Sequence, residues 1–210
     1  MPRPRFDRLA PDVQARILDA AADEFATRGL VGASFNAIIA SAGISKGAIY
    51  YYFDDKEDLF LTVVRRAVVD LAPSVGGMAV GELPESDFWG AVEGLMAASW
   101  TATVEHPQAF ALLKAAASLC FDASHSAPMA AFLGDMRAWL ETILAAGQRL
   151  GEVRVDLPLP LQSRLLVAVG QAFDTWILEE LMAGNLSEDD MDDVMVRYVE
   201  TFRRVVGTPS

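Results

Sequence analysis

The sequence contains little of what a disulfide framework, a zinc site or a membrane span requires. One cysteine in 210 residues excludes an internal disulfide, and two histidines supply few metal ligands. The longest stretch without a charged residue, 29–45, is shorter than a typical membrane helix and is broken by Gly, Ser and Asn. The first residues, MPRPRFDRLAP, lack the apolar segment of a signal peptide. We therefore expect a globular, cytoplasmic protein without a metal ion, another cofactor or a membrane partner.

Residue patterns that support catalysis are also scarce. His106, Cys120 and His125 could converge in the fold, but an isolated His or Cys in a helical domain is usually packed or solvated. No glycine-rich phosphate loop follows a strand, because the sequence shows no strand-like alternation. Carboxylates are plentiful, yet nothing marks two of them as sharing a pocket. We therefore expect that the protein is not an enzyme.

Charge is distributed unevenly along the chain. Residues 1–66 carry nine basic and nine acidic side chains, whereas residues 67–210 carry eight basic and twenty acidic ones, which accounts for the net charge of −12. An acidic larger part would repel non-specific DNA and confine any DNA contact to the N-terminal part. An ordinary acidic protein would explain the same distribution equally well.

Apolar residues recur at helical spacing along most of the chain and predict an all-α fold of about nine helices. The first helix is expected from Pro11 to Arg28, because proline suits a first helical position and Gly29 can end the helix. The segment 73–87 is rich in Gly and Pro and predicts a loop, and residues 2–10 predict a mobile arm. The arm either frays or carries its arginines to DNA. The other helices are expected at 35–42, 46–53, 55–71, 87–105, 107–123, 128–150, 159–184 and 188–206.

Residues 34–53 predict two short helices joined by a tight turn. Ser34 and Ser45 are each followed by a helical segment and can cap its free amides. Gly43 can adopt the positive φ that a sharp turn between helices requires. This arrangement is typical of a helix–turn–helix, whose second helix enters the major groove of DNA.

The second helix of this pair has side chains that suit contact with DNA. Small residues allow the backbone to approach the duplex, and lysine and tyrosine reach phosphates or base edges. The alternative is a helical corner in an unrelated all-α protein, with the tyrosines buried. The side chains in question are Lys46, Gly47, Ala48, Tyr50, Tyr51 and Tyr52.

These motifs resemble the TetR (tetracycline-repressor) family of bacterial transcriptional regulators. The resemblance rests on Gly29, on the run Ser45-Lys46-Gly47-Ala48-Ile49-Tyr50-Tyr51-Tyr52-Phe53, and on Lys56-Glu57-Asp58-Leu59. It is dense over residues 13–62, whereas the remaining two thirds of the chain match only in length and helical layout.

The resemblance implies two domains with separate tasks. Residues 1–55 would form a three-helix DNA-binding domain, residues 56–210 would bind an effector and dimerise, and the helix from 55 to about 72 would connect them. Lys56, at a helix N-terminus, would hold a phosphate, unless it is simply a solvated surface lysine. The implied DNA-binding residues are Ser34, Ser45, Lys46, Gly47, Ala48, Tyr50, Tyr51, Tyr52 and Lys56.

Aromatic and sulfur-containing residues in the middle of the chain, with a few polar ones, suit an apolar effector pocket. For any one of them, a place in the core is an equally good explanation. The pocket candidates are Met96, Trp100, Thr103, Phe110, Phe121, Met136, Trp139, Gln171 and Trp176.

The last two helices carry more apolar surface than one core-facing stripe needs. A symmetric homodimer through a four-helix bundle would cover it, whereas the alternative is a monomer in which both helices are internal. The interface candidates are Leu165, Val169, Phe173, Met195, Tyr198 and Phe202.

Together these features predict a ligand-responsive transcriptional regulator. We expect a repressor that binds a palindromic operator in double-stranded DNA as a homodimer and is released by a small, largely apolar effector. The alternative is an all-α small-molecule-binding or interaction protein that does not bind DNA, which would leave residues 45–56 unexplained.

Overall fold

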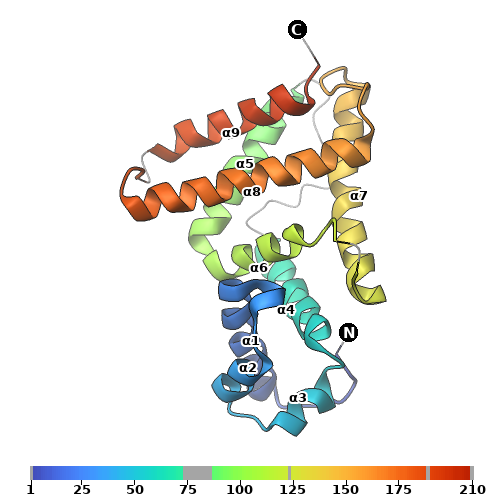
Figure 1. Cartoon of the computed structure of the whole chain (residues 1–210), viewed down its shortest axis with the longest axis vertical. Helices are drawn as coiled ribbons and strands as arrows, with labels where there is room; N and C mark the ends of the chain where they lie inside the picture. The colour runs from blue at the N-terminus through green and yellow to red at the C-terminus, as the bar shows by residue number, and fades with distance from the viewer. Residues whose placement is uncertain (1, 73–86, 123, 188–189, 209–210) are drawn as a thin grey trace. The chain divides into compact units, whose positions relative to one another are not determined.

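The computed structural model describes residues 2–72, 87–122, 124–187 and 190–208, and within these ranges the fold is all-α, as predicted (Figure 1). All nine helices in these ranges begin within about three residues of the expected positions and end within about five. The predicted loop at 73–87 lies almost wholly outside the described residues. The helices are α1 (Pro11–Gly32), α2 (Phe35–Ala42), α3 (Lys46–Tyr52), α4 (Lys56–Leu71), α5 (Phe88–Glu105), α6 (Pro107–Ser118), α7 (Ala127–Arg149), α8 (Leu159–Ala183) and α9 (Met191–Val206).

The chain packs as two compact units. Unit 1 comprises residues 1–73 and 102–134, and unit 2 comprises residues 74–101 and 135–210, so that α5 and α7 each contribute to both. This division describes packing within the chain. The functional boundary expected near residue 55 stays a prediction.

In unit 1, α1 packs against α2, α4 and α6, and α4 also packs against α6. The core is aromatic: the rings of Phe25 and Phe60 meet edge to face with their centroids 5.1 Å apart, and both are fully buried. Burial of each such ring contributes about 1.5–3 kcal/mol to folding. This core fixes α4, which directly follows α3 in the chain.

The first helix does not end at Gly29 as expected. Gly29 leaves helical geometry with φ 62° and ψ −179°, but one further turn follows, and the helix ends at Gly32. The amide of Ala33 then donates to the carbonyl oxygen of Gly29 at 3.2 Å. Gly29 therefore kinks α1 and does not stop it, because its backbone freedom allows the chain to bend and continue.

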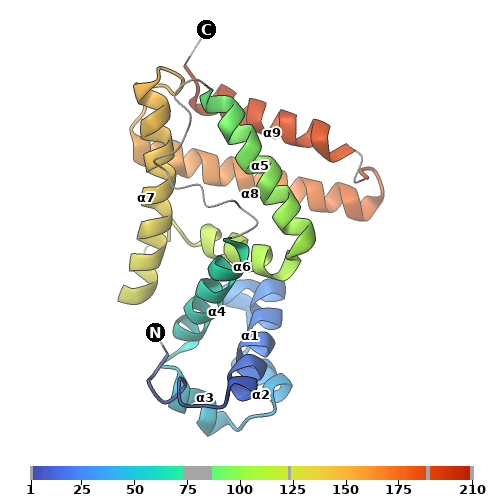
Figure 2. The same cartoon turned by 180° about the vertical axis from the view of Figure 1, so that it is seen from behind.

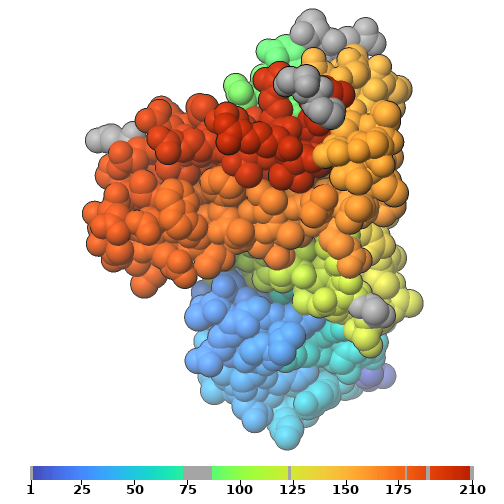
Figure 3. All heavy atoms as spheres, turned by 45° about the horizontal axis from the view of Figure 1, so that its top comes forward, coloured from blue at the N-terminus to red at the C-terminus, as the bar shows by residue number. Residues whose placement is uncertain are grey.

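In unit 2, α8 and α9 pack side by side, and both lie exposed on the face that Figure 3 shows. The ring of Phe173 stacks on that of Tyr198 with centroids 4.5 Å apart. Gly170 makes room for this packing, because a Cβ there would lie 2.9 Å from the Tyr198 hydroxyl oxygen. Burial, with a smaller contribution from Asp174, raises the pKa of Tyr198 above its ordinary value.

A short antiparallel bridge between Val153 and Gly207 ties the segment before α8 to the end of α9. The amide of Arg154 donates to the carbonyl oxygen of Val206 at 2.8 Å. None of the helices described here is both long enough and apolar enough to cross a lipid bilayer.

Candidate nucleic-acid interface

The two-helix motif forms as the sequence predicts. The Ser34 hydroxyl accepts from the amide of Ala37 at 3.4 Å, and the Ser45 hydroxyl accepts from the amide of Ala48 at 3.2 Å. Gly43 ends α2 with φ 64°, and its amide donates to the carbonyl oxygen of Ala40. Both caps and the turn are therefore local consequences of serine and glycine chemistry.

Helix α3 has one buried and one exposed face. Ile49 and the following Phe53 are completely buried, whereas Tyr50 and Tyr51 are 46% and 48% exposed. Lys46 and Gly47 are also exposed, and Ala48 and Tyr52 are half-buried. The alternative in which all three tyrosines are core residues is therefore wrong for Tyr50 and Tyr51.

Contacts with α2 fix the orientation of α3. The ring of Phe35 meets that of Tyr50 edge to face at 5.6 Å between centroids. Ile38 of α2 is fully buried, as is Ile49 of α3. The exposed lysine and tyrosines thus project from a helix whose opposite face is anchored in the core.

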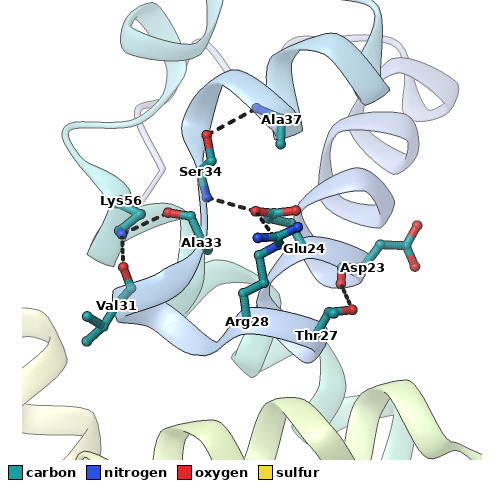
Figure 4. Close-up of polar contacts among 9 residues, drawn as sticks. All are labelled: Asp23, Glu24, Thr27, Arg28, Val31, Ala33, Ser34, Ala37 and Lys56. Atoms are coloured by element: carbon teal, nitrogen blue, oxygen red, sulfur yellow. Dashed lines mark hydrogen bonds and ion pairs between the residues drawn. The ribbon is translucent and has the colours of Figure 1, made fainter.

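Ser34 has a second role at the turn between α1 and α2. Its amide donates to the Glu24 carboxylate at 2.9 Å, and Arg28 pairs with the same carboxylate at 3.4 Å (Figure 4). Glu24 therefore joins α1 to the first residue of the motif.

Lys56 was expected to hold a phosphate, but its ammonium group also has a structural role. Its Nζ donates to the carbonyl oxygens of Val31 and Ala33, both at 3.0 Å, where α1 ends (Figure 4). These carbonyls lack helical partners, so the lysine satisfies them. An ammonium has three N–H donors, so two of them are used here and the third is left for another acceptor.

The start of α4 is capped by Asp55. The Asp55 carboxylate accepts from the amide of Asp58 at 2.8 Å, and the Asp58 carboxylate accepts from the amide of Asp54 at 3.1 Å. These two hydrogen bonds fix the chain between α3 and α4.

The expectation of a mobile arm at residues 2–10 is wrong. Phe6 is only 3% exposed and packs on the rings of Tyr52 and Phe53, with centroids 6.1 and 4.9 Å away. The amide of Arg3 donates to the carbonyl oxygen of Tyr52 at 2.9 Å, at the end of α3. We call residues 2–10 the arm. Both cartoon views show the arm beside α3 (Figure 1 and Figure 2).

The arm also places two arginines at α3. The Arg3 guanidinium donates to Asp54 from Nε at 2.8 Å and from a terminal nitrogen at 2.6 Å. The Arg5 guanidinium carbon lies 4.3 Å from the centroid of the Tyr51 ring. The arm thus brings positive charge to the end of α3, which is followed by two aspartates.

A second link joins the start of α4 to the segment between α6 and α7. The Glu57 carboxylate lies 3.0 Å from Nδ1 of His125 and accepts from the amide of Ser126 at 2.8 Å. Burial opposes ionisation of Glu57, but the hydrogen bonds to His125 and Ser126 outweigh it and hold the pKa of this carboxyl below its ordinary value. Among the described residues, Nε2 of His125 is buried without a hydrogen-bond partner.

The nine pocket candidates are not gathered at a single site by the contacts within either unit. Thr103, Phe110 and Phe121 belong to unit 1, whereas the other six belong to unit 2. In unit 2, Trp100 lines a hollow of about 300 Å³ between α5 and α9, and Trp176 lines another of about 400 Å³ between α8 and α9. The assignment of all nine residues to an effector pocket stays a prediction.

The dimer candidates divide by exposure. Tyr198 and Phe202 are buried within the single chain, whereas Leu165, Val169, Phe173 and Met195 are half-buried. Three further apolar side chains on the same two helices, Leu161, Met182 and Val196, are 42%, 82% and 59% exposed and are not among the interface candidates. The sequence shows that both helices are apolar on more than one face, but it does not show which of these faces packs in the core and which stays exposed.

Parts of this sequence are similar to known proteins. Residues 17–63 match the model of the family described as bacterial regulatory proteins, tetR family. The chain is 44% identical over 62 residues to the HTH-type transcriptional repressor SCO4008 of Streptomyces coelicolor, which covers 30% of this chain and 32% of that protein. It is 30% identical over 143 residues to the HTH-type transcriptional repressor NicS of Pseudomonas putida, which covers 67% and 66%. The chain therefore spans less than two thirds of these curated relatives.

Solved structures resemble the whole chain in fold. A TetR family transcriptional regulator from Chloroflexus aurantiacus superposes with a TM-score of 0.66 at 21% identity, with each chain covered completely. A putative tetR family regulator from a Shewanella species gives a TM-score of 0.66 at 17% identity over 94% of this chain and 99% of that one. At such identities the likeness concerns the fold alone.

Proposed function

This chain belongs to the TetR family of bacterial regulatory proteins, and we propose on that premise that it is a ligand-responsive transcriptional regulator, a repressor that binds a palindromic operator in double-stranded DNA. The exposed tyrosines and Lys46 on α3 carry this proposal, because they project from a helix that its buried face holds in place. The curated relatives SCO4008 and NicS are both named as repressors. A protein acting on bacterial DNA would work in the cytoplasm.

The DNA contacts would come from the exposed face of α3 and from its caps. Lys46, Tyr50 and Tyr51 would reach phosphates or base edges, and Gly47 and Ala48 would let the backbone approach. Ser34, Ser45 and Tyr52 would hold the helices in register, and the third N–H of Lys56 would face a phosphate.

A homodimer would place two copies of α3 in successive major grooves of the operator. The exposed apolar side chains of α8 and α9 support this assembly, because such a surface is stabilised when a second copy covers it. An effector held among aromatic residues would release the DNA if it bound the DNA-free conformation about 5–150-fold more tightly.

The decisive experiment is selection of bound fragments from random duplex DNA at two salt concentrations. We expect an inverted repeat to be enriched and its binding to weaken as salt rises, because phosphate contacts release counterions. A folded protein that enriches no sequence at low salt would refute DNA recognition and favour the small-molecule-binding alternative.

A further inference from the structure

We infer that residues 3–6 of the arm are part of the nucleic-acid interface and that Arg5 is a contact to the DNA phosphate backbone. This inference rests on the proposed function and adds a residue that the helix–turn–helix motif does not contain. Three features of the structure carry it. The arm is anchored at the end of α3, Arg5 lies over an exposed tyrosine of α3, and the arginines of the arm offset the negative net charge of residues 46–55.

Two contacts anchor the arm on either side of Arg5. Phe6 is buried against the rings of Tyr52 and Phe53, and the backbone amide of Arg3 donates to the carbonyl oxygen of Tyr52. That carbonyl belongs to the last residue of α3, where helical partners run out. The arm therefore ends α3 as a cap would, and Arg5 is held between two fixed neighbours.

Arg5 lies over the face of Tyr51, which is the most exposed aromatic ring of α3. Stacking leaves the edge of a planar guanidinium open, and its N–H donors match the two oxygens of a phosphate. Arg5 is itself exposed. One residue thus orients the tyrosine and offers a cation on the same surface.

Charge favours the same assignment. Residues 46–55 contain Lys46 and two aspartates, Asp54 and Asp55, for a net charge of −1, and the helix C-terminus adds partial negative charge. Arg3 pairs with Asp54, and Arg5 lies beside this pair. Adding the two arginines to residues 46–55 changes the net charge from −1 to +1. Without the arm, the end of α3 would repel the phosphates that Tyr51 must approach.

The test measures binding of Arg5→Ala to the duplex enriched by the wild type, over a series of salt concentrations. We expect about tenfold weaker binding and a plot of log affinity against log salt whose slope falls by about 0.9, as for one lost phosphate contact. Arg8→Ala is the matched control, because it removes the same charge from an exposed residue between Phe6 and α1. Thermal unfolding of each variant shows that the fold is kept.

Arg5→Lys separates charge from stacking. It keeps the ammonium charge without the planar group, so we expect the salt slope to be retained and the affinity to fall between wild type and Arg5→Ala. Wild-type affinity and slope in Arg5→Ala, or an equal effect of Arg8→Ala, would overturn the assignment. If the wild type itself shows no salt-dependent binding, the proposed function fails and the role of Arg5 fails with it.

Discussion

The residues from Tyr50 to Phe53 have different environments although they are consecutive. Tyr50 and Tyr51 are about half exposed, Tyr52 packs against Phe6, and Phe53 is completely buried. A helix rotates about 100° per residue, so one aromatic run can supply both a core anchor and a surface for contact. The function of each ring is therefore decided by its position on the helix and not by its chemistry.

Tyr51→Ala tests this distinction. We expect about tenfold weaker operator binding with little change in thermal stability, because a half-exposed ring contributes little to the core. Phe53→Ala is the contrast: removal of a fully buried ring should lower the free energy of unfolding by about 3–5 kcal/mol. If Tyr51→Ala unfolds the protein, Tyr51 is a core residue and its assignment to DNA is wrong.

Lys56→Met tests the structural role of that lysine. The change removes both hydrogen bonds to the end of α1, so we expect the free energy of unfolding in urea to fall by about 1–3 kcal/mol. Lys46→Met, at an exposed position of α3, should leave stability unchanged while weakening DNA binding. Equal stability of the two variants would show that the contacts of Lys56 with Val31 and Ala33 contribute nothing.

At the scale of elements, α4 is tied at its first turn to two other parts of unit 1. Lys56 binds the end of α1, and Glu57 binds His125 and Ser126 before α7. A helix fixed in this way cannot shift at its start without breaking hydrogen bonds.

The Glu57 contact predicts a pH dependence. Its pKa is lowered in the folded state, so its contribution to stability is present above the unfolded-state value of about 4.5 and is lost as pH falls through the lower folded value. Glu57→Gln should therefore be less stable than wild type at pH 7, with the difference shrinking toward pH 3, measured by urea unfolding. Glu105→Gln, at an exposed position, is the control. An unchanged difference at pH 3 would contradict ionisation as the cause.

At the scale of the whole molecule, each unit has its own core, and only unit 2 contains α8 and α9. Their packing buries Tyr198 and Phe202 within one chain but leaves Trp176, Met182 and Val196 exposed. Burial of apolar surface contributes about 25 cal/mol of stabilising free energy for each Å² removed from water. Association of two chains through these helices would supply that burial.

Trp176→Glu tests the proposed homodimer. We expect the wild type to sediment as a dimer and the variant as a monomer, because a carboxylate cannot be buried unpaired at low cost. Trp139→Glu is the matched control, since Trp139 is equally exposed on α7. A dimer that survives Trp176→Glu, or a monomeric wild type, would contradict the assignment of this face.

Much of the fold was determined by local chemistry that the sequence displays directly. Serine caps set where α2 and α3 begin and the φ of Gly43 sets where α2 ends, because each depends on residues a few positions apart. The recognition helix and its exposed tyrosines were predicted for the same reason. Periodicity shows that a helix has an apolar face, but it does not show which neighbour covers that face.

The tertiary structure decided which side chains meet across long stretches of sequence. Only it brings Arg5 over Tyr51, Lys56 onto the carbonyls of α1, and His125 to Glu57. The arm shows the physical reason: its arginines and prolines have the composition of a mobile segment, but Phe6 is buried against the rings of Tyr52 and Phe53, which follow it by more than forty residues. Contacts between distant residues depend on the packed fold, which local sequence patterns do not encode.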